Sequence, residues 1–148
     1  MRDSVLIFGS GMMGCAIGCC AALAHNKVIM YDADSAVLQK AKKRVSDNLN
    51  ELSDLGLCTM EQTEEAKKYI SVSRDVTQAC EQTKVVIEAV FENLEIKQNV
   101  FEMLDRLLPA AVPLLSNTSG LRITDISSRT KHPERTLTTH FWLPANLI

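Results

Sequence analysis

The sequence lacks a long apolar run. Its 148 residues contain no stretch near the roughly 20 consecutive apolar residues that a membrane-spanning helix needs. Residues 5–8 are apolar but too few for the core of a secretory signal, and glycines follow at once. An excess of one charge is also missing, because 16 Lys and Arg face 18 Asp and Glu. We therefore expect no membrane and no nucleic-acid partner.

Cysteines at metal-binding or redox spacing are absent too. The five cysteines form no C-x-x-C pair and have no histidines at zinc spacing, so we predict no metal site. An odd number of cysteines without a secretory signal indicates reduced thiols and a cytoplasmic protein, and we expect most of them in the core. What is present is 46% hydrophobic and 23% charged residues, which is typical of one soluble globular domain with a real core.

Short apolar runs alternate with longer amphipathic stretches along the chain. We predict strands at residues 5–8, 27–32, 70–73, 84–90, 112–116 and 136–141, and helices at 12–24, 35–52, 93–108 and 123–128. Residues 53–68 are hard to assign, although "TEEAKK" indicates a helix. This alternation predicts an α/β fold of the Rossmann type, doubly wound, with a mostly parallel sheet and helices on both faces.

The stretch "LIFGSGMMGCAIG" joins the first predicted strand to the first helix with the spacing G-x-G-x-x-G. Gly9 would allow a tight turn, Gly11 the approach of a pyrophosphate, and Gly14 close packing of the helix on the sheet. The first helical turn, with Met12 and Met13, would offer free N–H groups and the positive end of the helix dipole to the phosphates. The stretch therefore predicts a dinucleotide-binding loop.

An acidic residue ends the second predicted strand. Asp32 follows the glycines at about the 20-residue offset at which an acid binds the adenosine ribose hydroxyls. A carboxylate here would repel a 2′-phosphate, which favours NAD over NADP. FAD is the alternative cofactor, and a glycine turn beside a surface aspartate is the alternative without a ligand. We prefer NAD because later motifs suit hydride transfer.

Three further stretches follow in order: "EAVFENLEIKQNVFEMLD", "SNTSGLRITDIS" and "HPERTLTTHFWLP". With the glycine loop, they resemble the NAD-binding domain of the L-3-hydroxyacyl-CoA dehydrogenase family over nearly the whole chain, most loosely at residues 34–75. The resemblance implies an oxidoreductase of fatty acid metabolism that oxidises the 3-hydroxyl of an L-3-hydroxyacyl-CoA with NAD, or reduces the 3-ketoacyl-CoA. It also implies that residues 1–148 are the cofactor domain. The family's C-terminal helical domain, which closes the substrate cleft and forms the dimer, is not in this chain.

The resemblance assigns roles to single residues. It implies that His140 is the catalytic general base, that Ser119 binds the substrate, and that Glu92, Lys97 and Asn117 belong to the cofactor site. A neutral imidazole, with a pKa near 6.5, suits removal of a hydroxyl proton as hydride leaves. Without the family, Glu92 and Lys97 could be ordinary charges at a helix start, Asn117 a turn residue and His140 a structural histidine.

Three features depart from the family pattern. The glutamate that orients the family's histidine lies further downstream than this chain extends, so we expect residues 1–148 alone to bind NAD weakly and to show little activity. Leu143 stands where the family has a cofactor-binding asparagine. Asn48 and Leu55 stand where it has a serine and a lysine that bind coenzyme A. Two alternatives therefore stay open: a dehydrogenase of a small, gulonate- or carnitine-like 3-hydroxy acid, and an NAD-binding module without turnover.

Overall fold

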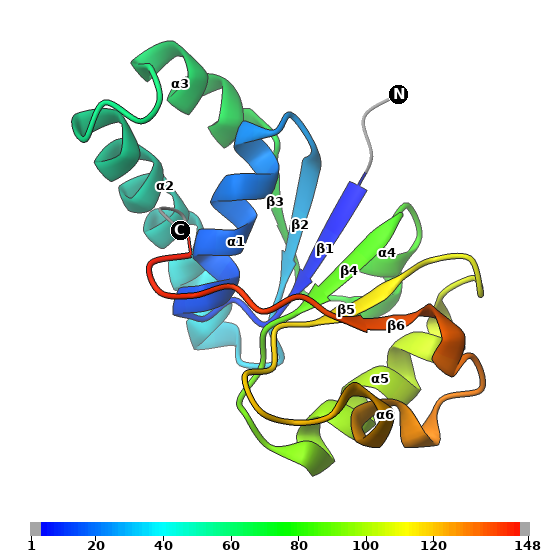
Figure 1. Cartoon of the computed structure of the whole chain (residues 1–148). Helices are drawn as coiled ribbons and strands as arrows, with labels where there is room; N and C mark the ends of the chain where they lie inside the picture. The colour runs from blue at the N-terminus through cyan, green and yellow to red at the C-terminus, as the bar shows by residue number, and fades with distance from the viewer. Residues whose placement is uncertain (1–3, 146–148) are drawn as a thin grey trace.

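A computed structural model describes residues 4–145. Their six strands form one sheet. Each pair of neighbouring strands is parallel, and the order across the sheet is β3-β2-β1-β4-β5-β6 (Figure 1). The order reverses between β1 and β4, the kind of switch point at which α/β sheets bind ligands. The strands are β1 (Ser4–Phe8), β2 (Lys27–Tyr31), β3 (Ile70–Ser73), β4 (Val85–Glu88), β5 (Leu114–Ser116) and β6 (Thr136–Thr138).

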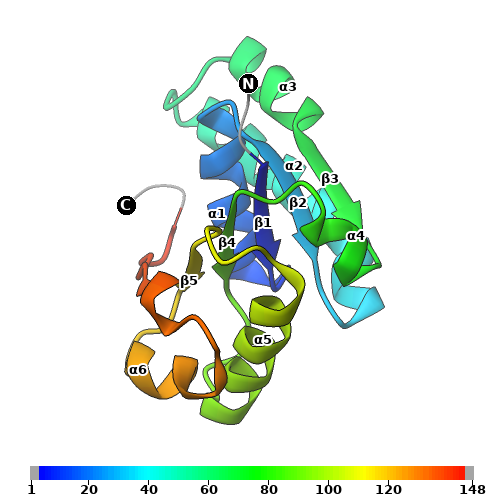
Figure 2. The ribbon, with the colours of Figure 1, turned by 90° about the vertical axis from the view of Figure 1, so that its right-hand side faces the viewer.

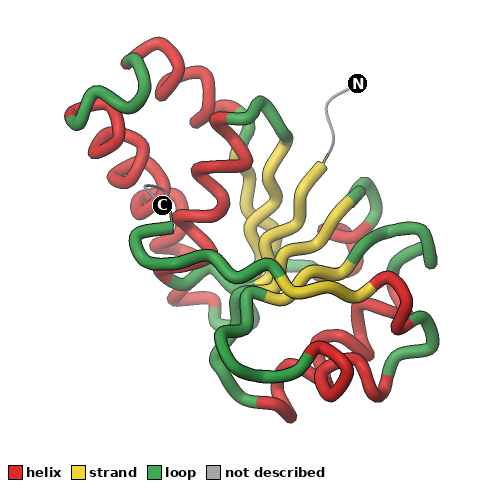
Figure 3. The backbone as a smooth tube through the Cα atoms, in the orientation of Figure 1, coloured by secondary structure: helices red, strands yellow, loops and turns green. Residues whose placement is uncertain are grey.

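Helices cover both faces of this sheet. α1 and α2 pack on one face, and α4, α5 and α6 pack on the other. Figure 3 shows the strands between these two layers, and Figure 2 shows α5 and α6 side by side. The helices are α1 (Met12–Leu23), α2 (Ser35–Asp54), α3 (Met60–Lys68), α4 (Val76–Cys80), α5 (Leu94–Leu107) and α6 (Ile123–Ile126), with 3₁₀ turns at Ser127–Arg129 and Pro133–Arg135.

The central strand β1 supplies side chains to both cores. Val5 and Ile7 belong to the cluster under α1 and α2, whereas Leu6 and Phe8 belong to the cluster under α5. Successive strand residues point to opposite faces, so a strand buried on both sides is apolar throughout. This double burial fixes β1, and therefore the loop that follows it.

The predicted fold class is confirmed, and each predicted strand is present. β5 begins two residues later than expected because Pro113 has no N–H to donate to the ladder, although its carbonyl still accepts from the Val86 N–H. The sequence prediction missed α4. Its N-cap is Asp75, whose carboxylate accepts from the N–H groups of Thr77 and Gln78. The ambiguous region contains α3, which starts at a capping box between Thr59 and Gln62.

The chain beyond β6 turns back toward α1. Figure 1 shows this last segment leaving the α5–α6 side of the molecule and crossing to α1. Phe141 packs on the cluster under α1, and the Cys20 Sγ lies 3.3 Å from the Ala145 carbonyl oxygen. The segment that follows His140 is thereby anchored at both ends.

Candidate cofactor and catalytic site

The three glycines of the loop are required for different reasons. Gly9 has φ of +106°, and a Cβ there would lie 2.6 Å from the Ala89 carbonyl oxygen. A Cβ at Gly14 would collide with the Gly9 carbonyl oxygen. At Gly11, by contrast, a Cβ would meet no atom within 4 Å. Gly9 lets the loop pass close to the chain after β4, Gly14 lets α1 start against the loop, and Gly11 keeps the loop's outer side open for a ligand, as a pyrophosphate requires.

The N-terminus of α1 has no side-chain cap within residues 4–145. Its N-cap is Gly11, which has no side chain to accept a hydrogen bond, and the first turn carries no acidic residue. The first N–H groups of a helix need partners, and an anion is a favourable one. The first-turn residues Met12 and Met13 line the adjacent pocket, as the sequence predicts for the phosphate site.

The carboxylate of Asp32 is held at the end of β2 by backbone groups. Its Oδ2 accepts from the Ser10 N–H at 2.7 Å, and its Oδ1 accepts from the Asp34 N–H at 2.9 Å. Each carboxylate oxygen has a further lone pair, so both can still accept from a ribose hydroxyl. Asp32 lines the same pocket as the glycine loop, and the geometry therefore fits the predicted ribose contact.

A pocket of about 480 Å³ opens between the glycine loop, the β2–α2 turn and the start of α5. Its walls are largely apolar and include Val37, Phe91 and Ile96. Phe91 is 84% exposed, which is unusual for an aromatic side chain beside a pocket. Apolar walls with a few placed polar groups are typical of cofactor sites. Adenosine and the pyrophosphate are the parts of NAD that suit this pocket.

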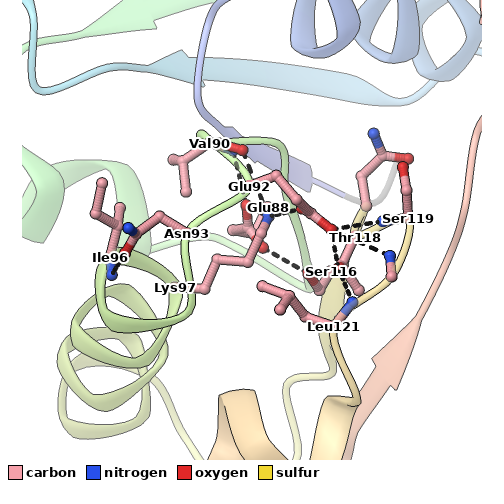
Figure 4. A network of polar contacts seen from close by, with 12 residues as sticks. Glu88, Val90, Glu92, Asn93, Ile96, Lys97, Ser116, Thr118, Ser119 and Leu121 are labelled. Atoms are coloured by element: carbon pink, nitrogen blue, oxygen red, sulfur yellow. Dashed lines mark hydrogen bonds and ion pairs between the residues drawn. The ribbon is translucent and has the colours of Figure 1, made fainter.

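Behind this pocket, Glu88 and Lys97 form a buried ion pair (Figure 4). Their side chains are 0% and 1% exposed, respectively. Glu88 Oε1 accepts from Lys97 Nζ and from the Val90 N–H, both at 2.7 Å, and Oε2 accepts from Ser116 Oγ at 2.6 Å. The Lys97 ammonium is therefore engaged inside the protein and connects α5 to the ends of β4 and β5.

Glu92 organises the turn after β5 (Figure 4). Its Oε1 accepts from Thr118 Oγ1 at 2.5 Å and from the N–H groups of Ser119 and Gly120 at 2.9 and 3.1 Å. Burial alone would raise the pKa of Glu92, but these hydrogen bonds and the Lys97 ammonium together lower it. Glu92 thus stays charged and fixes the backbone of the turn that carries Ser119.

Asn117 connects the two predicted catalytic turns. Its Oδ1 accepts from the Phe141 N–H at 2.7 Å, and its own N–H donates to the Glu88 carbonyl at 2.8 Å. Ser119 follows β5 and His140 follows β6, two adjacent parallel strands, so both residues lie at the carboxyl edge of the sheet. Both are exposed, and neither lines the pocket beside the glycine loop. The His140 ring lies 5.1 Å from the Trp142 ring, centroid to centroid.

Sequence reasoning missed Glu88, the central residue of the network. The signal was present in "KVVIEAV", where an acid interrupts an apolar run that is expected to be buried. A buried carboxylate needs a partner, and Lys97 on the next helix is the cation that reaches it. Asn117 lies directly after β5, and its contact with the Phe141 N–H could not be predicted because it depends on the pairing of β5 with β6.

The cysteines are free thiols, and three of the five are buried. Burial raises the pKa of Cys19 to about 12 and that of Cys80 to about 11, so both are protonated and unreactive. The expectation of core packing is confirmed for Cys15, Cys19 and Cys80. Among residues 4–145, no helix is both long and apolar enough to cross a membrane.

A parallel sheet of this order, with a glycine loop at its switch point and a fixed acid after the neighbouring strand β2, defines a dinucleotide-binding domain of the Rossmann type. A sequence model of the family "3-hydroxyacyl-CoA dehydrogenase, NAD binding domain" matches residues 4–148. The chain belongs to this family, and its cofactor is NAD rather than the alternative FAD.

Similar proteins support the assignment. A probable 3-hydroxybutyryl-CoA dehydrogenase of Bacillus subtilis is 35% identical over 97% of this chain and 50% of its own length. The crystal structure of 3-hydroxybutyryl-CoA dehydrogenase from Escherichia coli is 32% identical, with a TM-score of 0.91 over 100% of this chain and 31% of that chain. A 5-formyl-3-hydroxy-2-methylpyridine 4-carboxylic acid 5-dehydrogenase is 28% identical, with a TM-score of 0.87 over 100% of this chain and 47% of that chain. The chain thus spans half or less of the length of these relatives.

Proposed function

We propose that this chain binds NAD for the oxidation of the 3-hydroxyl of an L-3-hydroxyacyl-CoA, or for the reverse reduction. The observation that carries the proposal is the hydrogen bond from the Phe141 N–H to Asn117 Oδ1. It joins the turn that contains Ser119 to the segment that contains His140, on the edge of the sheet that also carries the glycine loop. This link supports a joint role of the His140 base and the Ser119 hydroxyl in the reaction.

The chemistry divides among these residues. When bound, NAD would supply the hydride acceptor for this chemistry. The neutral imidazole of His140 takes the proton from the substrate hydroxyl, and Ser119 Oγ hydrogen-bonds to the same oxygen and aligns it. Glu92 keeps Ser119 in place by accepting from its N–H. In the reverse direction, protonated His140 returns the proton.

The relatives suggest how the chain fits into a larger enzyme. Because it spans half or less of their length, we propose that it supplies the cofactor domain and that a second domain covers the acyl-CoA substrate and mediates dimerisation.

The five free thiols favour a reducing compartment, and we place the protein in the cytoplasm.

A small 3-hydroxy acid is the second candidate substrate. Leu143 replaces the expected cofactor-binding asparagine, and Asn48 and Leu55 occupy the positions where coenzyme A contacts are expected. Leu55 is 57% exposed at the end of α2 and offers no charge to a phosphate. The pyridine-carboxylic-acid dehydrogenase described above has a name that includes no coenzyme A. An NAD-binding module without turnover is the third candidate.

Turnover assays separate these candidates. The longest protein that the gene encodes is supplied with NADH and either acetoacetyl-CoA or free acetoacetate, and loss of NADH absorbance is followed. We expect oxidation of NADH with the thioester in clear preference to the free acid. Preference for the free acid would favour the second candidate, and binding of NADH without turnover on either substrate would favour the third.

A further inference from the structure

Ser10, between the first two glycines of the loop, is held through each of its polar groups. Its N–H donates to Asp32 Oδ2, and its hydroxyl donates to the Tyr31 carbonyl at 3.1 Å. Its carbonyl oxygen accepts from Arg44 Nη1 at 3.2 Å and from the Cys15 thiol at 3.3 Å. The side chain is 0% exposed. The loop is therefore fixed by contacts to β2, α1 and α2.

Arg44 is the positively charged member of this set, and Asp32 is the negatively charged one. It lies on α2, 34 positions along the chain from Ser10, and is half-buried. Among the ion pairs of the described residues, none includes Arg44. Its neighbour Lys43, by contrast, is exposed and pairs with Asp47 at 2.7 Å. Arg44 thus places a positive charge against the loop backbone without a direct ion-pair partner among the described residues.

The contacts of the Ser10 carbonyl oxygen determine where the N–H of the next residue, Gly11, points. A peptide unit is planar and trans, so the Ser10 carbonyl and the Gly11 N–H point in opposite directions. Because Arg44 and Cys15 hold the carbonyl on the protein side, the Gly11 N–H is turned outward. Gly11 lines the pocket, and the space beside it is open.

We propose that Arg44 is a positioning residue for the phosphate-binding loop. Arg44 turns the Gly11 N–H toward the pyrophosphate and adds a positive charge behind the loop. A planar guanidinium suits a role between helix and loop because it hydrogen-bonds in a fixed direction and keeps its charge at all relevant pH values. The inference deepens the proposed function, because it assigns the phosphate recognition of the same cofactor site to a residue outside the glycine motif.

The test compares ligands with and without phosphates on residues 1–148. Affinities for NADH, ADP and adenosine are measured by titration, with ADP and adenosine followed by displacement of NADH fluorescence. Arg44→Met keeps the apolar stem but removes the donor and the charge. We expect it to weaken NADH and ADP about tenfold, the size expected for a hydrogen bond to a charged group. Adenosine should change less than twofold, because its binding depends on Asp32 and the apolar walls.

Lys43→Met is the matched control, since it removes the same charge from an adjacent, exposed position of α2. It should leave the ADP-to-adenosine ratio unchanged. If Arg44→Met does not fold, Arg44→Leu, which also lacks the donor and the charge, is measured in its place with the same expectation. An unchanged ratio in the Arg44 variant, or equal weakening of ADP and adenosine, would overturn the inference. Such a result would leave the proposed function intact, whereas NADH binding without turnover in the longer protein would defeat that function and leave this inference standing.

Discussion

Among the single residues, His140 is the proposed general base of the reaction. It lies two positions beyond β6, is exposed, and has the Trp142 ring beside its own. We predict that His140→Ala lowers kcat of the longer protein by a factor of about 10² to 10⁴, the usual contribution of a general base. NADH affinity should not change, because His140 does not line the pocket beside the glycine loop. A steady-state assay and an NADH titration check both parts, and equal losses of turnover and NADH affinity would contradict the proposed role.

Residues with a local role were predictable, and residues that act through distant partners were not. Gly9, Gly14 and Asp32 follow from a spacing within one strand–loop–helix–strand unit. Glu88 acquires its role from Lys97 and Ser116, which the fold brings together from two other elements. The only sign of a buried ion pair in the sequence is an acidic residue within an apolar run, as Glu88 is in "KVVIEAV".

At the scale of elements, the Glu88–Lys97 pair connects α5 to β4 and β5. We predict that Lys97→Met lowers the free energy of unfolding by roughly 3–5 kcal/mol, because it leaves a buried carboxylate unpaired. Combining it with Glu88→Gln should recover a substantial part of that loss, since the remaining group is neutral. Urea denaturation of the two single variants and the double variant measures the coupling.

The exposed pair Lys43–Asp47 provides the control for this cycle. Lys43→Met should cost less than about 1 kcal/mol, because exposed ion pairs contribute little. A loss of that small size for Lys97→Met would contradict the assignment of Lys97 to the interior.

The elements themselves were largely predictable because their apolar patterns have a clear period. The amphipathic helix α5 and the apolar strands β1 and β4 are examples. α4 was missed because five residues are too few to show a helical period. Its start depends on the Asp75 cap, a signal that also occurs in ordinary turns.

At the scale of the whole molecule, a second buried ion pair fastens the segment before β6 to α5. Arg135 Nη2 lies 2.7 Å from Asp105 Oδ1, and the Lys131 N–H donates to Asp105 Oδ2 at 2.7 Å. Burial alone would raise the pKa of Asp105, but the hydrogen bonds from Arg135 and the Lys131 N–H lower it. The folded protein therefore binds this proton less readily than the unfolded chain does.

The lowered pKa of Asp105 predicts a loss of stability in acid. The contribution of charged Asp105 to the free energy of unfolding is fully present above the ordinary aspartate pKa of about 3.9. It disappears as the pH falls through the lower pKa that Asp105 has in the folded protein. We expect Asp105→Asn to cost about 3 kcal/mol at pH 7 and to flatten the fall in unfolding free energy between pH 5 and pH 3. Urea unfolding across that range checks this, with the exposed Asp47→Asn as control. An unchanged slope in Asp105→Asn would contradict the prediction.

The most direct test of the NAD site is a titration of residues 1–148 with NADH. Binding is monitored by energy transfer to NADH from Trp142, the single tryptophan. NADPH serves as the comparison, because the Asp32 carboxylate would repel its 2′-phosphate. We expect saturable energy transfer with a clear preference for NADH. Absence of transfer with both cofactors, or equal affinity for the two, would contradict the assignment of the glycine loop and Asp32 as an NAD site.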